Sequence, residues 1–173
     1  MPSAKAVYLP SQLVQFFLTH VSRREGHQIL QVRRFKPGFE ALGLVADFIA
    51  ATPPFGAFGA AKLLTALRRQ LSTGCHLAGF EGDQLVAYCG WMPISAQIGL
   101  DWMRGEGELT PSENEPSDAG VVTIVRILNR RDVLPLIRAC RVANPNRRVF
   151  FKRDYEVGAM TTKKSTVMNR ISK

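Results

Sequence analysis

Cysteine is scarce in this chain of 173 residues, and its placement follows no metal or redox pattern. Cys75, Cys89 and Cys140 are odd in number and widely spaced, without the CxxC or Cys/His spacing of a zinc site or a redox motif. We therefore predict no metal site and three reduced, mostly buried thiols that behave as small hydrophobes. A nucleophilic role for Cys89 or Cys140 is the alternative that the sequence leaves open.

The chain also lacks a long apolar run. Its longest apolar stretch, residues 42–58, is interrupted by polar residues and prolines, and no stretch reaches the roughly 20 residues of a membrane-spanning helix. Residues 1–10 carry one lysine and no apolar core ahead of a small-residue cleavage site, unlike a secretory signal. We expect a cytoplasmic protein without a membrane span.

Acidic residues are sparse in the last third of the chain, which makes that part strongly basic. The net charge is +9, and from Arg126 onward thirteen Lys or Arg stand against three acids. Six of the fourteen acids fall instead within residues 101–118, beside the single cation Arg104. A cationic field of this kind speeds association with polyanions or acidic proteins. We predict an acidic macromolecular partner, with a solvated charged face as the alternative.

The length and an apolar share of 46% predict one globular domain, over residues 1–157, followed by a basic, flexible tail over residues 158–173. The domain is expected to fold alone or as a homodimer. Apolar residues at helical spacing predict three helices near the N-terminus, over residues 11–21, 37–52 and 60–71. The sequence between the first two, residues 29–35, fits either a strand or a continued helix.

From residue 76 the pattern changes to strands. Residues 76–80 and 85–92 predict a β-hairpin turning at Gly82, and both faces of its second strand are apolar, as in a central strand. The elements expected after it are a short helix over 93–103, a polar loop over 105–120, a strand over 121–128, a helix capped by Asp132 and a strand over 147–155. This order predicts an α+β fold, with helices packed on a sheet.

One block of the hairpin resembles a known family. Residues 85–95 (LVAYCGWMPIS) resemble the central strand of the RTX toxin-activating lysine acyltransferases, which reads much like VAYCxWAxLS. The order and spacing of the surrounding elements fit from about residue 52 to residue 155. Members of that family resemble Gcn5-type N-acetyltransferases in fold and move a fatty acyl chain from acyl carrier protein to lysines of a protoxin. The resemblance implies a mixed sheet of that type, flanked by helices, and protein-lysine acyl transfer.

The resemblance also implies where substrate and donor would bind. Tyr88, Cys89 and Trp91 would line an acyl pocket, with packing in the core as the alternative. Acyl carrier protein is acidic, so a cationic surface suits it as a donor. The residues expected to bind it are Arg130, Arg131, Arg138 and Arg141. We expect no tightly bound cofactor, because the acyl-pantetheine of the carrier would enter the site, and a second protein would be the acceptor.

The catalytic positions of the family are not retained. Its general base is a His in a Ser-x-x-His turn, where this chain has Thr52-Pro53-Pro54-Phe55, and Thr123 stands at the position of its Asp. A lysine ammonium, with a pKa of roughly 10.4, must lose a proton before it attacks a thioester, so a base is needed. His76, the histidine nearest the sheet, is the candidate catalytic residue, with a structural role as the alternative. The acetyltransferase phosphate loop is also missing, so coenzyme A binding is not indicated.

Two other functions stay open. The departures at Phe55 and Thr123 fit a non-catalytic homologue that acts as a binding or regulatory module. The third reading is a nucleic-acid-binding protein, because basic and aromatic residues are interleaved near the C-terminus, where they could contact phosphates and stack bases. These residues are Arg147, Arg148, Phe150, Phe151, Lys152, Arg153, Tyr155, Lys163, Lys164, Arg170 and Lys173.

Overall fold

The computed structural model describes residues 29–52, 55–111, 117–153 and 164–168. In chain order its elements are β1 (Gln31–Arg33), α1 (Phe39–Ala50), the 3-10 turn η1 (Phe55–Ala57), α2 (Ala60–Ser72), β2 (His76–Glu81), β3 (Gln84–Ile94), α3 (Ala96–Arg104), β4 (Ala119–Ile127), the 3-10 turn η2 (Arg130–Asp132), α4 (Val133–Ala143), β5 (Arg148–Arg153) and β6 (Lys164–Met168). The helix predicted over residues 11–21 lies outside the described residues.

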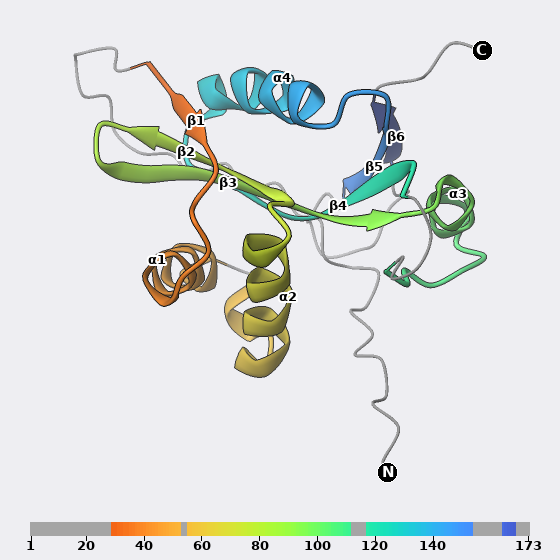
Figure 1. Cartoon of the computed structure of the whole chain (residues 1–173), viewed down its shortest axis with the longest axis horizontal. Helices are drawn as coiled ribbons and strands as arrows, with labels where there is room; N and C mark the ends of the chain where they lie inside the picture. Colours follow the sequence, from red (N-terminus) through yellow and green to blue (C-terminus); the bar gives the residue numbers. More distant parts are fainter. Residues whose placement is uncertain (1–28, 53–54, 112–116, 154–163, 169–173) are drawn as a thin grey trace.

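The six strands form one sheet in the order β1-β2-β3-β4-β5-β6 (Figure 1). Every neighbouring pair is antiparallel except β4 and β5, which are parallel. Gly82, with φ 58°, turns the chain between β2 and β3 in the left-handed conformation that glycine adopts readily. The mixed sheet, the hairpin and the central place of β3 confirm the predicted α+β fold. Over residues 29–35 the structure has a strand, β1, and not a continued helix.

Helices cover both sides of the sheet. α1 and α2 lie against one side, here called the α1–α2 face, and α4 lies across the other, the α4 face (Figure 1). α1 and α2 bury apolar residues that recur at helical spacing, so each turns one stripe toward the sheet. The core of the α1–α2 face consists of Ala41, Leu42, Val45, Ile49, Phe55, Leu63, Leu67, Leu71, Ala78, Phe80, Leu85, Tyr88 and Ile124.

The helices of the structure are short. The longest described helix, α2, has 13 residues. α4 fully buries Leu136 and Cys140, and its Val133, Ala139 and Ala143 are partly buried against the core. Across the described parts of the chain, none of the helices combines the length and the apolar character that crossing a bilayer requires.

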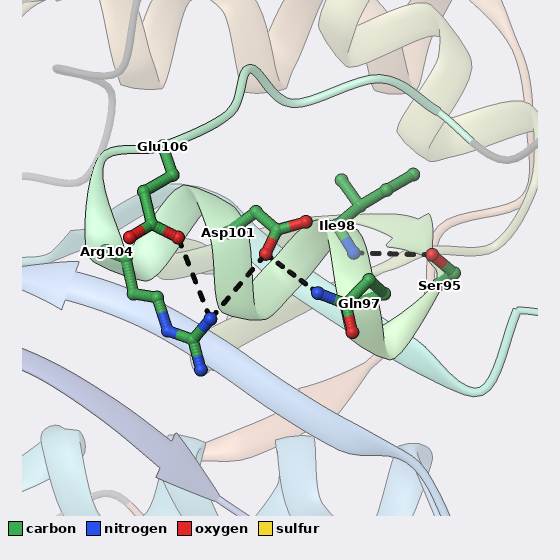
Figure 2. Close-up of polar contacts among 6 residues, drawn as sticks. All are labelled: Ser95, Gln97, Ile98, Asp101, Arg104 and Glu106. Carbon is green, nitrogen blue, oxygen red and sulfur yellow. Dashed lines mark hydrogen bonds and ion pairs between the residues drawn. The ribbon is translucent and has the colours of Figure 1, made fainter.

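α3 follows β3 directly and packs against β5. Ser95 caps its first turn, with the side-chain Oγ accepting a hydrogen bond from the Ile98 N–H at 3.4 Å (Figure 2). Gly99 faces the ring of Phe150, and a Cβ at this position would overlap the ring atoms. A glycine therefore allows the close approach of α3 to β5.

The far end of α3 belongs to the acidic stretch of the sequence. Arg104 Nη1 lies 4.0 Å from Asp101 Oδ1 and 3.7 Å from Glu106 Oε2, and Gln97 donates to Asp101 Oδ1 at 2.8 Å (Figure 2). The Arg104 and Glu106 side chains are largely exposed, and such ion pairs contribute about 0–1 kcal/mol each. Arg104, the single cation of the stretch, thus pairs with acids of its own segment, on and just after α3.

Two expectations differ from the structure. Asp132 stands at the N-cap position of α4, but its side chain makes no capping hydrogen bond. The reason is local: η2 leads straight into α4, so Asp132 has a helical backbone (φ −83°, ψ −9°) in place of the extended one that a capping side chain needs. The second difference concerns the tail expected over residues 158–173, in which Lys164–Met168 form β6 and pair with β5.

Candidate functional site

The main irregularity of the sheet is the separation of its two parallel strands. β4 and β5 pair at three positions only, Ala119↔Arg148, Gly120↔Val149 and Val121↔Phe150. Beyond these positions β4 continues to Ile127 beside β3, while β5 continues to Arg153 beside β6. The two central strands therefore part after three residues and leave one edge of β4 without a strand partner in the described chain.

The free edge of β4 presents main-chain hydrogen-bonding groups. The Leu128 N–H donates to the Val86 carbonyl at 2.9 Å, which makes these two residues a hydrogen-bonded pair of the β3–β4 ladder. Because such pairs alternate along antiparallel strands, Val125 and Ile127 direct their amides away from β3, toward the side of β5. An extended, amide-containing molecule can pair with such an edge as an added strand does.

An apolar cavity borders this edge on the α4 face. Its volume is about 20 Å³, and it is lined by Cys89, Val122, Val125, Ile127, Leu136, Ile137, Cys140 and Phe151. A cavity needs about 10–15 Å³ to hold one water, and empty cavities with purely apolar walls stay dry. In this state the cavity accepts at most a very small molecule, so a longer apolar chain could enter only if α4 moved outward.

The three residues expected to line an acyl pocket are divided between the two faces. Cys89 lines the cavity and is 3% exposed, and Trp91 belongs to the core of the same α4 face. Tyr88 is fully buried on the α1–α2 face, because side chains alternate along β3. The structure thus brings Cys89, but not Tyr88, to the cavity.

A buried polar network occupies the α1–α2 face behind the free edge. The carboxamide of Gln70 on α2 accepts a hydrogen bond from the Tyr88 hydroxyl at 3.0 Å and donates one to Thr123 Oγ1 at 2.9 Å. Thr123 in turn donates to the Gly90 carbonyl at 3.4 Å. Thr123 is the extra residue of a bulge in β4, since Gly90 pairs with Ile124 and Trp91 with Val122. Burial raises the pKa of the Tyr88 phenol, which stays a neutral donor.

His76 has both ring nitrogens engaged and no exposed surface. Its Nδ1 lies 3.0 Å from the Gln70 carbonyl, and its Nε2 accepts a hydrogen bond from the Phe35 N–H at 3.0 Å. This places the ring proton on Nδ1, because the Nε2 acts as acceptor. Burial lowers the pKa of His76, so the ring is neutral at physiological pH. These contacts favour the structural alternative over a catalytic base.

The residue at the position of the family's general base is also buried. Phe55, in η1, is 1% exposed and packs in the core of the α1–α2 face, with its ring centroid 6.0 Å from that of Phe58. Thr123 is bound within the Gln70 network. Neither side chain can accept a proton at neutral pH, and neither faces the cavity.

The arginines expected to bind a partner lie on and just before α4. All four are exposed, and the outer side of the helix also carries two exposed apolar residues, Leu134 at 63% and Val142 at 80%. Arg131 already forms an ion pair with Glu81. We call this surface the α4 outer face; it comprises Arg130, Arg131, Leu134, Arg138, Arg141 and Val142.

Arg126 is a residue that the sequence reading did not single out. It lies on β4 on the α1–α2 face, with its guanidinium carbon 4.3 Å from the centroid of the Phe48 ring. Burial lowers the pKa of Arg126, and its Nε is buried with no hydrogen-bond partner among the described residues. The signal was available, since Arg126 is the only charged residue in the apolar run 121–128.

The aromatic residues proposed to stack bases on β5 are not accessible. Phe150 is 0% and Phe151 4% exposed, and both are packed in the hydrophobic core, Phe150 against Gly99 of α3 and Phe151 at the cavity under α4. Tyr155 lies outside the described residues. Stacking by Phe150 and Phe151 is therefore excluded, because base stacking needs an accessible ring face.

No protein-family model matches the chain, and no curated protein matches its sequence. The chain is similar to solved structures of the GNAT family at low sequence identity. An acetyltransferase of this family from Brucella melitensis, in complex with acetyl-CoA, has 14% identity and a TM-score of 0.45, covering 76% of this chain and 79% of its own. GphF, a GNAT-like decarboxylase in complex with isobutyryl-CoA, has 14% identity and a TM-score of 0.47, covering 70% and 65%. A GNAT acetyltransferase from Streptococcus agalactiae has 9% identity and a TM-score of 0.46, covering 71% and 75%.

Proposed function

We propose that this protein binds an acyl thioester between β4 and β5 and acts as an acyltransferase of the toxin-activating type, with acyl carrier protein as donor and a protein lysine as acceptor. The observation that carries the proposal is the separation of β4 from β5 after three paired residues. The resemblance of residues 85–95, which include most of β3, supports the same assignment, because β3 is the strand beside the free edge.

The free edge suits the pantetheine arm of a carrier protein. Pantetheine is an extended chain with two amides, so it can exchange hydrogen bonds with the outward main-chain groups of Val125 and Ile127. The acyl group would follow into the cavity that the same two side chains line. At about 20 Å³ the cavity has to widen, and α4, which contributes Leu136, Ile137 and Cys140 to its lining, is the wall that would move outward.

The α4 outer face suits the carrier itself. Acyl carrier protein is acidic, and the face combines exposed guanidinium groups with exposed Leu134 and Val142. Opposite charges steer such an encounter and raise its rate, while an apolar contact at the centre contributes to affinity. The face belongs to the same helix that closes the cavity, so a carrier docked there would be close to the site of entry.

A non-catalytic binding module is the second candidate, and a specific observation favours it. Phe55 and Thr123 stand at the family's catalytic positions without a titratable group, and His76 is buried with both nitrogens occupied. Lysine attack requires a proton acceptor near the thioester. If none is supplied, the protein would hold an acyl-carrier without transferring its acyl chain.

The test uses the full chain, acyl carrier protein charged with a labelled acyl chain, and a lysine-containing acceptor protein. Binding is measured by surface plasmon resonance at two salt concentrations, and acyl transfer by mass spectrometry of the acceptor. Replacing Arg130 and Arg138 by Glu should lower the association rate about tenfold at low salt, because charge steering alters rates by about 10–1000-fold. The replacement of Lys62 and Arg68 by Glu, two exposed cations on α2 at the opposite face, is the control matched in net charge and should change the rate far less.

Three outcomes separate the candidates. Label on the acceptor supports an acyltransferase. Binding that depends on Arg130 and Arg138 without label transfer supports the non-catalytic module. Failure to bind the charged carrier, or an equal loss of association rate when Lys62 and Arg68 are replaced by Glu, overturns the donor assignment.

A further inference from the structure

Two of the three thiols meet in the interior, on elements that are far apart in the sequence. Cys89 lies on β3 and Cys140 on α4, and their sulfurs are 3.3 Å apart. Both residues are 3% exposed. A disulfide has an S–S length of about 2.05 Å, so the sulfurs need to approach by only about 1.2 Å to form a bond.

The third cysteine, Cys75, does not take part in this contact. Cys75 is buried as well, but its sulfur is directed to the Thr73 carbonyl at 3.8 Å, within its own segment. Cys89 and Cys140 instead both line the apolar cavity, which is otherwise walled by aliphatic side chains and Phe151. The pair is thus defined by its geometry and not by burial alone.

We propose that Cys89 and Cys140 are an oxidation site, at which a hydroperoxide converts the two thiols into a disulfide that ties α4 to β3. One sulfur attacks the peroxide oxygen and becomes a sulfenic acid, and a molecule of water or alcohol leaves. The second thiol displaces water from the sulfenic acid and forms the S–S bond. Two electrons pass from the sulfurs to the peroxide, and the two thiol protons leave in the oxygen products.

The surroundings of the two sulfurs make the reaction slow. The apolar cavity of about 20 Å³ does not hold a polar molecule at rest, so hydrogen peroxide reaches the sulfurs only when a local opening moves α4 outward. The hydrogen bond with Cys140, together with burial, raises the pKa of Cys89, so little thiolate is present at neutral pH. Oxidation should therefore need more peroxide, or more time, than an exposed thiol does.

The bond would restrain α4. Cys140 is one of the two fully buried residues of this helix, so a covalent link there ties the inner side of α4 to the centre of the sheet. It would also hold the cavity at its present width. This inference does not depend on the proposed function, because it concerns the two sulfurs and their helix alone.

The experiment treats the reduced full chain with graded hydrogen peroxide, blocks remaining thiols with an alkylating agent in denaturant, and maps the peptides without reductant. We expect a linked peptide pair containing Cys89 and Cys140, with Cys75 alkylated, and a rise in melting temperature that dithiothreitol reverses. Cys75→Ser should give the same link, whereas Cys140→Ser should give none.

Other outcomes would overturn the proposal. These are a link that includes Cys75, links only between two chains, or alkylation of all three cysteines after prolonged treatment. Because the decisive readout is a map of the unaltered chain, it stands even if Cys140→Ser fails to fold.

Discussion

Gly90 should be the least replaceable glycine of the sheet, because Gln70 occupies the space where a side chain would begin. A Cβ on Gly90 would lie 2.6 Å from Gln70 Nε2, and closer still to the other two atoms of the carboxamide. Gln70 is 4% exposed and cannot swing into solvent without leaving the network. Gly90→Ala must therefore displace the carboxamide and break its bonds to Tyr88 and Thr123.

The expected loss follows from these two bonds. A buried polar group left without its partner costs about 1–3 kcal/mol, so Gly90→Ala should lower the free energy of unfolding by about 3 kcal/mol. For a chain of this size each kcal/mol lowers the melting temperature by about 2–4 °C, which predicts a fall of about 6–12 °C. Gln70→Ala should cost about as much, because it removes the same bonds and leaves a small void.

The double variant is the decisive measurement. Gln70→Ala removes the atoms that the new Cβ would meet, so adding Gly90→Ala should cost almost nothing more. Urea unfolding, followed by the fluorescence of the buried Trp91 and Trp102, gives the four free energies of the cycle. If the two single losses add to within about 0.5 kcal/mol in the double variant, the sites are independent and the reasoning is refuted.

Two further predictions rest on single residues. Gly43, an exposed position inside α1, has no atom within 4 Å of an added Cβ, so Gly43→Ala should raise the free energy of unfolding by about 0.5–1 kcal/mol in the same urea assay, and a loss would contradict the packing of α1. Burial lowers the pKa of His76, so below about pH 6.5 the unfolded chain takes up a proton that the folded chain does not. The contribution of neutral His76 to the free energy of unfolding is therefore present above that pH and is lost as the pH falls. The stability difference between the wild type and His76→Gln should accordingly narrow between about pH 7.5 and 5.5, and a constant difference would show that His76 protonates freely in the folded state.

Elements with strong local signals were predictable from the sequence. α1 begins after Pro37-Gly38 and ends before the prolines, and Gly82 marks the turn of the hairpin, because each signal acts on its own few residues. Asp132 was misassigned as a capping side chain for the converse reason. A sequence shows which residue can cap a helix but not that a 3-10 turn precedes it and fixes its backbone as helical.

The candidate site could not be predicted in the same way, because its geometry depends on contacts between distant residues. Gln70 follows two arginines on an amphipathic helix, and nothing local shows that it is buried against Gly90 and Thr123. The meeting of Cys89 and Cys140 and the separation of β4 from β5 are likewise products of tertiary packing. The block 85–95 lies on the strand beside the free edge of β4, but the sequence did not show which of its side chains reach the cavity.

The two faces of the sheet limit how any acyl transfer here could work. On the α1–α2 face, the polar groups around Gln70 and His76 are hydrogen-bonded to one another. A substrate could gain access there only by breaking several of these hydrogen bonds, each of which contributes about 1 kcal/mol. On the α4 face the walls of the cavity are apolar, so moving α4 outward breaks no side-chain hydrogen-bond network comparable to that of Gln70, but it brings no proton acceptor to the site. Among the described residues, binding and proton removal are therefore separable, and a transferring enzyme would need its base from the acceptor, the carrier or a residue outside those described. A variant that abolishes carrier binding without altering the Gln70 network would isolate the first step, which is why the arginines of the α4 outer face are the ones to change first.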